Sequence, residues 1–425
     1  MKVCIIGQGY IGLPTAVLFA DNGCEVVGVD INPNIISSLN SCELHIEEPG
    51  LKEKLELAIN NKRYSASLNP QKSDVFIITV PTPNNIEDLS CDLSYVISAC
   101  KSIIPCLEKG NIVIIESTIA PMSTNKIIKP IFEKGGFEIG KDLYLAHCPE
   151  RVLPGKIIEE LINNDRIVGG ITPQCSNKAA EVYETFVKGK IMKTEAKTAE
   201  MSKCMENTFR DVNIALANEL TKICSKIGVN TLDVIELANK HPRVNIHSPG
   251  PGVGGHCLAI DPYFIYSLAP DEAKMIKLAR DTNNSMPKFV VDKTKEILAK
   301  ISGIETIENL KIAILGVSYK GNTGDTRESP ALTCIELFKK EGFDIAIHDP
   351  HINDENYCSF EEAIEDADIC IVLSEHDEFK NLDYNLMKEK MKSPIVFDTK
   401  NIVKISDKTK KENMDIINYG NMNKH

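Results

Sequence analysis

Residues 1–30 read MKVCIIGQGYIGLPTAVLFADNGCEVVGVD, and this stretch decides the fold. A short apolar run meets the glycine-rich sequence of residues 7–12, and a helical pattern extends over residues 13–21. A second apolar run, residues 26–29, ends at Asp30. Strand, glycine-rich turn, helix and second strand in this order predict a βαβ unit with the fingerprint of a dinucleotide-binding fold.

The turn needs its three glycines for different reasons. Gly7 permits the tight turn, Gly9 lets a pyrophosphate approach the backbone, and Gly12 lets the helix pack close to the strand. Asp30 follows at the spacing of the fingerprint acid, about 20 residues on, where a carboxylate accepts hydrogen bonds from the adenosine ribose. Because a carboxylate repels a 2′-phosphate and no arginine follows Asp30, NAD is favoured over NADP.

Further apolar runs of strand length alternate with helical patterns at residues 74–80, 111–116, 143–146 and 167–169. The alternation predicts a doubly wound, mostly parallel sheet, whose ligands bind at the carboxyl ends of its strands. Residues that follow these runs are therefore candidates for the nicotinamide ribose, the reacting alcohol or a proton, although each alone suits an ordinary loop. The residues expected to bind NAD are Gly7, Gly9, Tyr10, Ile11, Gly12, Asp30, Thr82 and Thr118.

Strand-like runs return at residues 311–315, 345–347, 369–373 and 395–397. They predict a second Rossmann-type domain. Its glycines do not form GxGxxG, so no second NAD site is expected there. The loop after its first run reads GVSYKGNTGDTRESP and carries Lys320, Asp325 and Arg327. Glycine-rich turns with a lysine and an arginine suit a nucleotide diphosphate, and the alternative is a charged surface loop.

Between the two sheets the pattern is helical. Residues 197–226 show one long helical pattern with an apolar stripe, and residues 273–300 contain another. We therefore expect an α/β protein, with two Rossmann-type doubly wound parallel-sheet domains joined by a central all-helical domain that offers a dimerisation face. The expected domains are an NAD-binding domain at residues 1–195, a central domain with the catalytic loop at residues 196–300, and a second, nucleotide-binding Rossmann-type domain at residues 301–425.

Two segments of the middle region carry groups suited to chemistry. Lys203 and Asn207 lie one helical turn apart, and such donors stabilise a developing alkoxide, although most such pairs are ordinary solvated side chains. Residues 245–264 read NIHSPGPGVGGHCLAIDPYF. If the segment after the glycines is helical, Cys257 lies in its first turn and shares a face with Asp261. A helix N-terminus favours the thiolate, whereas the ordinary alternative is a buried structural cysteine.

Composition narrows the classes of protein. A net charge of −12 over 425 residues argues against a nucleic-acid-binding protein. No apolar run approaches the length of a membrane span, so no membrane association is expected. The 14 cysteines contain no CxxC pair and read as reduced thiols of a cytoplasmic protein. Histidine and cysteine meet only as sequence neighbours, which make poor zinc-ligand pairs, so no metal site is expected.

Four features together indicate oxidation of a sugar nucleotide. They are an NAD domain, a cysteine nucleophile, a lysine–asparagine pair and a second sheet whose loop is suited to bind phosphate. A simple alcohol dehydrogenase needs no cysteine. A four-electron oxidation to a carboxylate does, because the intermediate aldehyde must become a hydride donor again. A thiolate that adds to the aldehyde gives a thiohemiacetal, whose oxidation gives a thioester that water cleaves.

The chain resembles the UDP-glucose/GDP-mannose dehydrogenase family from end to end. The motifs that carry the resemblance are GQGYIGLP, VPTP, ESTIAP, HCPERVLPG, AEMSKCMENTFRDVNIALANEL, PGPGVGGHCLAIDPYF and GVSYKGNTGDTRESPA. The resemblance implies two successive NAD-dependent oxidations at the sugar C6. It also implies a homodimer or higher homo-oligomer through the central helices, in which Arg243 can serve the neighbouring subunit.

The resemblance assigns roles to particular residues. Cys257 is implied to be the covalent nucleophile, and Asp261 to orient a water or transfer a proton. Glu150 is implied to assist thioester hydrolysis. The residues implied to be catalytic are Cys257, Lys203, Asn207, Asp261, Glu150 and Thr118. The residues expected to contact the UDP-sugar are Glu150, Arg151, Val152, Lys203, Asn207, Arg243, His247, Gly254, Tyr319, Lys320 and Arg327.

Two positions depart from the UDP-glucose branch of the family, which has a glutamate where this chain has Pro154 and a lysine where it has Ile260. The forms PERVLPG and HPRVN with PGPGVGGHC look most like the branch that oxidises UDP-N-acetyl-D-mannosamine. The same chemistry on UDP-N-acetylglucosamine, which differs only at C2, or on UDP-glucose is the alternative. More distant alternatives are a two-electron 3-hydroxyacid-type dehydrogenase and an NAD-binding protein without turnover.

Overall fold

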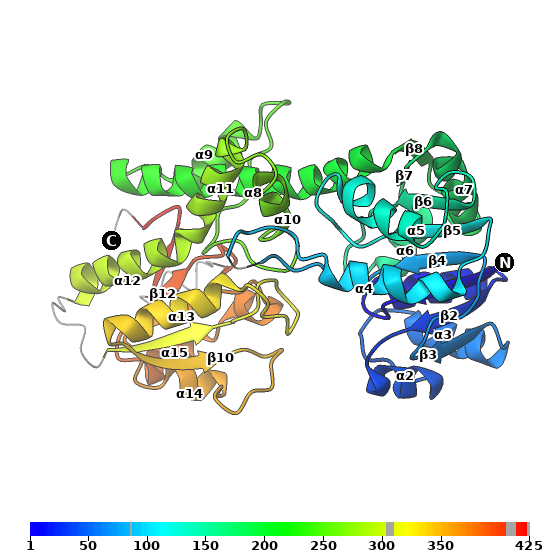
Figure 1. The fold of residues 1–425 in the computed structure, drawn as a ribbon. Helices are drawn as coiled ribbons and strands as arrows, with labels where there is room; N and C mark the ends of the chain where they lie inside the picture. The colour runs from blue at the N-terminus through cyan, green and yellow to red at the C-terminus, as the bar shows by residue number, and fades with distance from the viewer. Residues whose placement is uncertain (86, 303–309, 405–413, 423–425) are drawn as a thin grey trace. The chain divides into compact units, whose positions relative to one another are not determined.

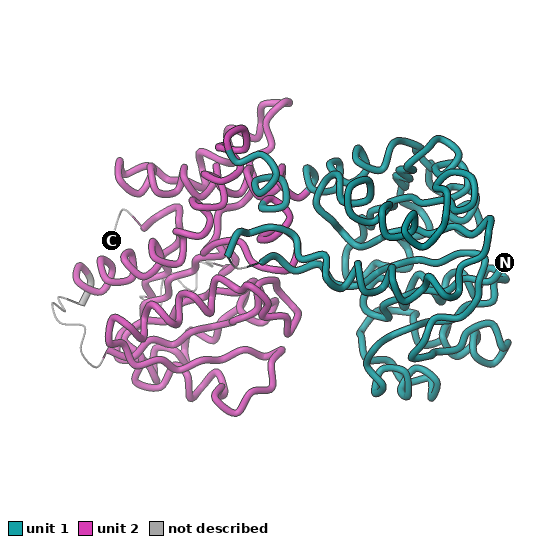
Figure 2. The backbone as a smooth tube through the Cα atoms, viewed as in Figure 1, with its two compact units in different colours: residues 1–206, 263–270 teal, residues 207–262, 271–425 magenta. Residues whose placement is uncertain are grey.

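The computed structural model describes residues 1–85, 87–302, 310–404 and 414–422. Figure 2 shows that the chain divides into two compact units. Unit 1 comprises Met1–Glu206 and Tyr263–Pro270, and unit 2 comprises Asn207–Pro262 and Asp271–His425.

Unit 1 contains an eight-stranded sheet of order β3-β2-β1-β4-β5-β6-β7-β8 (Figure 1). Its strands are β1 (Lys2–Ile6), β2 (Glu25–Val29), β3 (Tyr64–Ser67), β4 (Val75–Ile78), β5 (Asn111–Ile115), β6 (Leu143–His147), β7 (Arg166–Gly170) and β8 (Ile191–Glu195). Neighbouring strands are parallel except β6 and β7, which pair antiparallel with His147 opposite Gly169. The first residue of β7 therefore falls at the edge of the sheet where β6 ends.

Helices cover both faces of this sheet, which explains the continuous apolar runs. Val3 and Ile5 of β1 belong to one hydrophobic core, and Cys4 and Ile6 belong to the other. The first core includes side chains of α1 (Gly12–Asp21), α2 (Pro33–Asn40), α3 (Leu51–Asn60), α6 (Ile157–Asn163) and α7 (Pro173–Tyr183). The second includes side chains of α4 (Ser94–Ile103) and α5 (Lys129–Lys134).

Unit 2 contains a five-stranded, wholly parallel sheet of order β10-β9-β11-β12-β13. Its strands are β9 (Lys311–Leu315), β10 (Asp344–His348), β11 (Ile369–Val372), β12 (Ile395–Asp398) and β13 (Asp415–Asn418). One face packs on α12 (Met286–Ser302) and α13 (Pro330–Glu341), and the other packs on α14 (Phe360–Ile364) and α15 (Tyr384–Lys390). This sheet is doubly wound as well.

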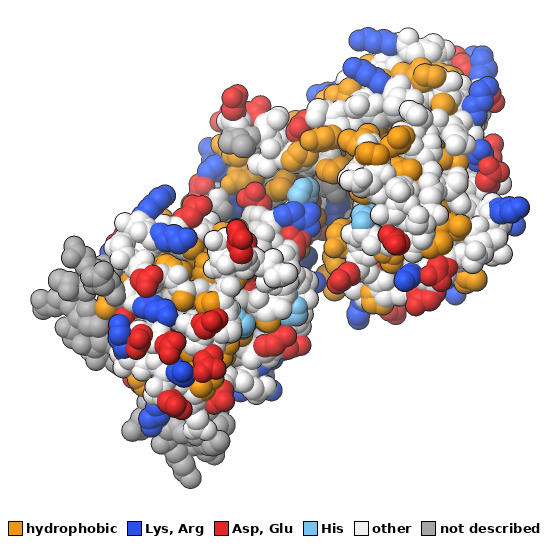
Figure 3. Space-filling model, turned by 90° about the horizontal axis from the view of Figure 1, so that it is seen from below, with side chains coloured by type: hydrophobic (Ala, Val, Ile, Leu, Met, Phe, Trp, Pro, Cys, Tyr) orange, Lys and Arg blue, Asp and Glu red, His pale blue; other side chains and the backbone are white. Residues whose placement is uncertain are grey.

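The central region is helical. It comprises α8 (Ala196–Ile227), which runs from unit 1 into unit 2, then α9 (Thr231–Ala238), α10 (Asp261–Tyr266), α11 (Lys274–Asn284) and α12. In the part of the chain that the structure describes, no helix combines the length and apolarity that a membrane crossing needs. On the face seen in Figure 3, Lys and Arg side chains are interspersed with Asp and Glu.

The structure confirms the predicted fold class of two parallel-sheet Rossmann-type domains with a central helical region. The long helix predicted at residues 197–226 matches α8, whereas the pattern over residues 273–300 is broken into α11 and α12. The domain boundaries stay a prediction, and residues 303–309, just after the expected boundary at 301, lie outside the described residues.

Candidate active site

The turn after β1 has the geometry that a dinucleotide requires. Gly7 has a φ of 97°, and a Cβ there would lie 2.8 Å from the carbonyl oxygen of Thr79. A Cβ at Gly12 would lie 1.9 Å from the carbonyl oxygen of Gly7, so helix and turn touch backbone to backbone. Gly9 differs, because a Cβ there would meet nothing within 4 Å. The open space at Gly9 fits the approach of a pyrophosphate.

Asp30 stands beside this turn, at the end of β2. Its carboxylate accepts hydrogen bonds from the backbone N–H of Gln8 at 3.0 Å and of Asn32 at 2.9 Å. The side chain is half-buried, so it keeps a face on which a ribose can bind. Tyr10 is 47% exposed and Ile11 is half-buried, and both immediately precede α1.

The two threonines predicted at the sheet edge lie together. The hydroxyl of Thr82 donates to the carbonyl oxygen of Thr118 at 2.6 Å, which joins the loops after β4 and β5. Thr82 is 6% exposed, whereas Thr118 is half-buried. The loop that follows Thr118 is fixed to α8, because the buried carboxylate of Glu200 accepts from the backbone N–H of Met122 at 2.6 Å and of Thr124 at 2.8 Å.

Glu150 belongs to a buried ionic cluster. Arg166 donates through Nη2 to Glu150 at 2.8 Å and through Nη1 to Glu116 at 3.1 Å. The Tyr183 hydroxyl also donates to Glu116, at 2.6 Å, and the guanidinium lies 4.4 Å from the centre of the Tyr183 ring. Burial raises the pKa of Glu116 to about 7, which Arg166 opposes and the charge of Glu150 reinforces.

The remaining predicted residues of unit 1 lie close to this cluster in sequence or space. Arg151 forms an ion pair with Glu206 at 2.8 Å, and Val152 packs against the hydrophobic core. Lys203 is half-buried on α8. Burial lowers the pKa of His147, the last residue of β6, to about 3, and the positive charge of Lys203 lowers it further. Lys203 therefore lies near the end of β6.

In unit 2 the glycine-rich loop is fixed from several sides. Asn213 of α8 accepts from the backbone N–H of His247 at 2.9 Å, and Asn218 accepts from that of Gly250 at 2.9 Å. Further on, the backbone N–H of Gly255 donates to the carbonyl oxygen of Arg327 at 3.0 Å. The loop is therefore held both by α8 and by the segment after β9.

Cys257 lies one turn before the start of α10, whereas the sequence predicts it in the first turn of that helix. Its carbonyl oxygen accepts from the backbone N–H of Asp261 at 2.8 Å, but α10 begins only at Asp261. Among the cysteines of the described residues, Cys257 is the exposed one. The carboxylate of Asp261 accepts from Nδ2 of Asn207 at 2.6 Å, and the two side chains are 3% and 7% exposed. Asp261 thus fixes the orientation of the Asn207 amide.

The predicted nucleotide loop meets the glycine-rich loop within unit 2. A Cβ at Gly254 would lie 2.8 Å from Cβ of Tyr319, and one at Gly255, whose φ is 84°, would lie 2.6 Å from the Tyr319 ring. Arg327 pairs with Asp325 at 2.6 Å, and this hydrogen bond raises the Arg327 pKa; Cys257, when ionised, raises it as well.

Three predicted substrate residues are less closely held. Lys320 is half-buried in the same loop, and Arg243 is exposed. The ring of His247 lies 6.4 Å from that of Phe209, and burial lowers the pKa of His247. The structure therefore brings Gly254, Tyr319 and Arg327 together but leaves Arg243 on the surface.

Sequence reasoning missed two groups of residues. Glu116, Arg166 and Tyr183 surround Glu150, and the available signal was a charged residue at each end of an apolar run. The second group is the hydrogen-bonded pair of Asp349 and His376.

Asp349 and His376 anchor the nucleotide loop. Oδ2 of Asp349 accepts from the backbone N–H of Val317 at 2.8 Å and from Nε2 of His376 at 3.1 Å. Burial alone raises the pKa of Asp349, but these bonds hold it at about 2. The ligand atoms of His351, His376 and Glu378 lie within 4.8 Å of one another. Because Nδ1 of His376 accepts from the backbone N–H of Asn322 at 2.8 Å, both of its ring nitrogens are engaged in loop anchoring.

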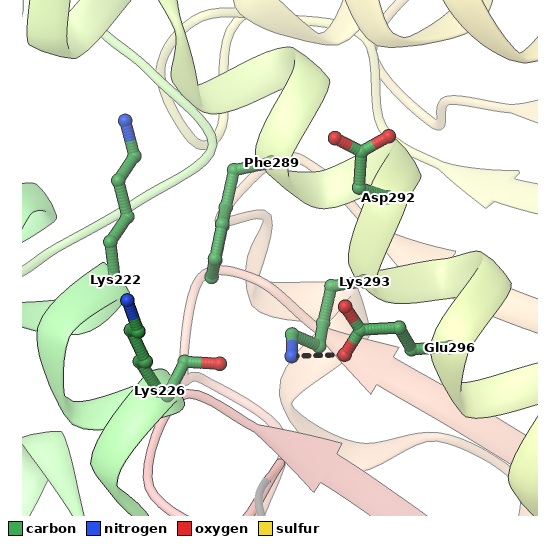
Figure 4. A pocket seen from close by; sticks show the side chains of 7 residues that line it. Lys222, Lys226, Phe289, Asp292, Lys293 and Glu296 are labelled. Atoms are coloured by element: carbon green, nitrogen blue, oxygen red, sulfur yellow. Dashed lines mark hydrogen bonds and ion pairs between the residues drawn. The ribbon is translucent and has the colours of Figure 1, made fainter.

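A separate hollow of about 300 Å³ lies in unit 2 (Figure 4). Lys222 and Lys226 project from α8, and Phe289 and Lys293 project from α12. None of the predicted site residues lines this hollow. Lys222 is 15 positions after Asn207 on α8, which corresponds to roughly 22 Å along a helix.

A dinucleotide turn and a second Rossmann-type sheet together indicate a nicotinamide-dependent dehydrogenase. Residues 1–187 match the NAD-binding domain of the UDP-glucose/GDP-mannose dehydrogenase family, residues 197–285 match its central domain, and residues 313–405 match its UDP-binding domain. The chain belongs to the UDP-glucose/GDP-mannose dehydrogenase family, and its cofactor is NAD.

Individual relatives are similar over their whole length. The UDP-N-acetyl-D-mannosamine dehydrogenase of Methanocaldococcus jannaschii is 50% identical over 410 residues, which cover 95% of this chain and 92% of that one. The structure of the UDP-N-acetyl-mannosamine dehydrogenase of S. aureus is 51% identical, with a TM-score of 0.91 and full coverage of both chains. That of the enzyme from Pyrococcus horikoshii is 40% identical, with a TM-score of 0.92 and full coverage of both.

Proposed function

We propose that this chain oxidises the C6 hydroxyl of UDP-N-acetyl-D-mannosamine to the carboxylate of UDP-N-acetyl-D-mannosaminuronic acid. The observation that carries the proposal is the exposed Cys257 one turn before Asp261, whose carboxylate fixes the amide of Asn207 at 2.6 Å. The substrate is the one named for relatives that are 50% and 51% identical. Bound NAD supplies the hydride acceptor for each of the two oxidations.

In the first oxidation the hydroxyl loses its proton, and C6 becomes an aldehyde. Lys203 and the free N–H of the Asn207 amide stabilise the alkoxide from which the hydride leaves. The sulfur of Cys257 then bonds to the aldehyde carbon, and the resulting thiohemiacetal is a hydride donor again. Its oxidation gives a thioester. Water cleaves the carbon–sulfur bond with Glu150 as proton acceptor and Asp261 as the group that orients the water, while Thr118 contacts the reacting alcohol.

The UDP-sugar is assigned to the loop after β9. Arg327 and Lys320 supply positive charge for the diphosphate, and Tyr319 and Gly254 form the wall on which the nucleotide rests. The sugar is assigned to Arg151, Val152 and His247, together with Glu150, Lys203 and Asn207. We propose the same three domains as the sequence predicts, with boundaries at residues 195/196 and 300/301.

We further propose a homodimer formed through α8, in the cytoplasm. Apolar side chains stand exposed along that helix, including Phe209 at 61%, Leu216 at 56% and Ile223 at 47%. An exposed apolar stripe of this kind is typical of a protein interface. Arg243, which is exposed, is assigned to the substrate of the neighbouring subunit. Sedimentation of Leu216→Glu tests the dimer, since a monomeric wild type or an unchanged dimer would refute it.

The test of function is NADH release with UDP-N-acetyl-D-mannosamine, UDP-N-acetylglucosamine and UDP-glucose, each supplied alone and scored against the product. Two NADH per uronic acid from the first sugar are expected. Two from another sugar would keep the chemistry and move the substrate, and none from any would refute the proposal. Cys257→Ser should abolish acid formation and retain NAD binding. Cys106→Ser, a half-buried cysteine of unit 1, is the matched control and should retain activity.

A further inference from the structure

The cluster around Glu150 holds more charge than a structural ion pair needs. Two carboxylates, Glu116 and Glu150, share one guanidinium, and the three side chains are 0%, 10% and 5% exposed in the order Glu116, Glu150, Arg166. Burying charges is costly, and a buried ion pair is seldom a net source of stability. The second carboxylate makes the cost larger. Stability alone therefore does not account for Glu116.

The geometry links the position of Glu150 to Glu116 through a rigid group. Arg166 divides its two terminal nitrogens between the two carboxylates, at 2.8 Å and 3.1 Å. A guanidinium is planar, so fixing one end fixes the other. Tyr183 holds Glu116 at 2.6 Å and supports the guanidinium with its ring. The other oxygen of Glu150 accepts from the backbone N–H of Arg151 at 2.6 Å, so both of its oxygens are held.

The cluster also has a defined charge balance. Above about pH 7, where Glu116 is ionised despite its raised pKa, the cluster carries one negative charge more than Arg166 neutralises. The groups that face Glu116 are Arg166, Glu150, Tyr183 and Cys148. Oε2 of Glu116 has no hydrogen-bond partner among the described residues. The charge of Glu116 therefore competes with that of Glu150 for the single guanidinium of Arg166.

We propose that Arg166 and Glu116 are positioning residues for Glu150 in thioester hydrolysis. Arg166 fixes the carboxylate of Glu150. The charge of Glu116 competes for the same guanidinium, so Arg166 does not fully neutralise Glu150. The inference rests on the proposed role of Glu150. In that step a water oxygen bonds to the thioester carbon and a water proton passes to Glu150. The carbon–sulfur bond breaks, and the electron pair of that bond returns to the sulfur of Cys257, with no oxidation or reduction.

The test is rapid mixing of Glu116→Gln with NAD and UDP-N-acetyl-D-mannosamine. Glutamine keeps the size of the side chain and removes its charge. Because both hydride transfers precede hydrolysis, we expect a burst of two NADH per site followed by a steady-state rate about tenfold lower than that of the wild type, a partial loss of general-base catalysis. Intact-protein mass spectrometry should find the acyl adduct on the chain, and the KM for NAD should not change.

Two variants separate this effect from simple destabilisation. Glu48→Gln changes another buried carboxylate of unit 1, which accepts from the backbone N–H of Gly155 at 2.8 Å and of Ile157 at 2.7 Å. It should lower stability without adduct accumulation. Glu150→Gln should accumulate the adduct more fully than Glu116→Gln.

Three results would contradict the inference in distinguishable ways. If Glu116→Gln behaves as Glu48→Gln does, or keeps the wild-type rate, Glu116 has a structural role alone. If Glu150→Gln hydrolyses normally while the wild type releases two NADH, the role of Glu150 is wrong and the dehydrogenase stands. If the wild type releases no NADH with any of the three sugars, the proposed function fails, and this inference fails with it.

Discussion

Asp30 in the first sheet and Asp349 in the second occupy the same place in their βαβ units, yet the side chain of Asp30 is half-buried and that of Asp349 is buried. Each follows the second strand and accepts from a backbone N–H just after the first strand, that of Gln8 at 3.0 Å and that of Val317 at 2.8 Å. Each donor follows a glycine of positive φ, 97° in the first sheet and 86° in the second. The backbone arrangement is the same.

The side chains around the two acids differ. Asp30 is half-buried, whereas Asp349 is 5% exposed and accepts a further bond from His376. The turns differ as well, because α1 begins at Gly12, directly after the first turn, while the second helix begins only at Pro330. Because Asp349 is buried and is covered by His376, it presents no open face to a ribose, whereas Asp30 does. We therefore expect nucleotide recognition in the second sheet to come from the inserted loop, which Asp349 anchors.

The largest effect is expected from Gly12→Ala, which breaks the first arrangement. Its Cβ would lie 1.9 Å from the carbonyl oxygen of Gly7 and 2.5 Å from Oγ1 of Thr79. Because the nearest atom is backbone, we expect the free energy of unfolding to fall by roughly 3 kcal/mol, the upper end for overpacking, and NAD binding to be lost. Calorimetry and NAD titration measure the two effects.

Gly9→Ala is the matched control. Since a Cβ at Gly9 would meet nothing within 4 Å, stability should stay within about 0.5 kcal/mol of the wild type. The methyl group would stand where the pyrophosphate approaches, so NAD affinity should fall. Wild-type stability in Gly12→Ala, or unchanged NAD affinity in Gly9→Ala, would contradict this account of the turn.

The next largest effect is expected from His376→Ala, which removes the side chain that covers Asp349 and donates a hydrogen bond to it. Removing one partner of a buried hydrogen-bonded pair costs about 1–3 kcal/mol. The pKa of Asp349 is held at about 2, below that of an unfolded aspartate, about 3.9. Its stabilisation is therefore present above about pH 4 and lost as the pH falls toward 2. In His376→Ala the folded pKa should rise toward the unfolded value, so the acid-induced loss of stability should be smaller and should end at a higher pH.

Calorimetry suits this measurement, because the chain has no tryptophan. The control is His351→Ala, since the bond from His351 to Asp349, at 2.9 Å, comes from the backbone and survives the change. The KM for the UDP-sugar should rise in His376→Ala, while the KM for NAD stays constant. Equal changes in both histidine variants would show that the pair does not anchor the loop.

Most of the fold could be predicted from the sequence, because strands that are buried on both faces form continuous apolar runs. The missed strands are β3, β8 and β13, and each lies at an edge of its sheet. An edge strand has one neighbour fewer and needs less apolar surface. β3 reads YSAS and β8 reads IMKTE, which carry little apolar signal.

The site was predictable where chemistry is local in sequence and not where it depends on distant pairing. Cys257 and Asp261 follow from one loop, but the hydrogen bond from Asn207 to Asp261 spans 54 residues. Arg166 was missed because β7 runs antiparallel to β6, which brings its first residue, rather than its last, to the ligand edge. The direction of a strand is decided by its pairing in the sheet, and the five-residue sequence of β7 does not indicate it.

A smaller effect is expected from Asp30→Ala, which removes the open acid of the first sheet. Hydrogen bonds to a charged group contribute about 1.5–3 kcal/mol, so the KM for NAD should rise about tenfold or more. Loss of the negative charge should also reduce discrimination against NADP. Steady-state kinetics with both cofactors measure these changes. The KM for the UDP-sugar should stay constant, and a parallel rise in both KM values would mean that the two nucleotide sites are not separable.

The smallest effect is expected at the hollow lined by Lys222, Lys226 and Lys293. It is basic, as a nucleotide site must be, but it lacks the strand-end acid and the glycine turn that both sheets share. Lys222 donates to the hydroxyl of Ser285, and Lys293 is engaged by Glu296 at 2.5 Å. Lys222→Ala should therefore change the KM for NAD and for the UDP-sugar less than twofold. A larger change in either KM would show that lysines alone, without the βαβ turn, bind a nucleotide in this chain.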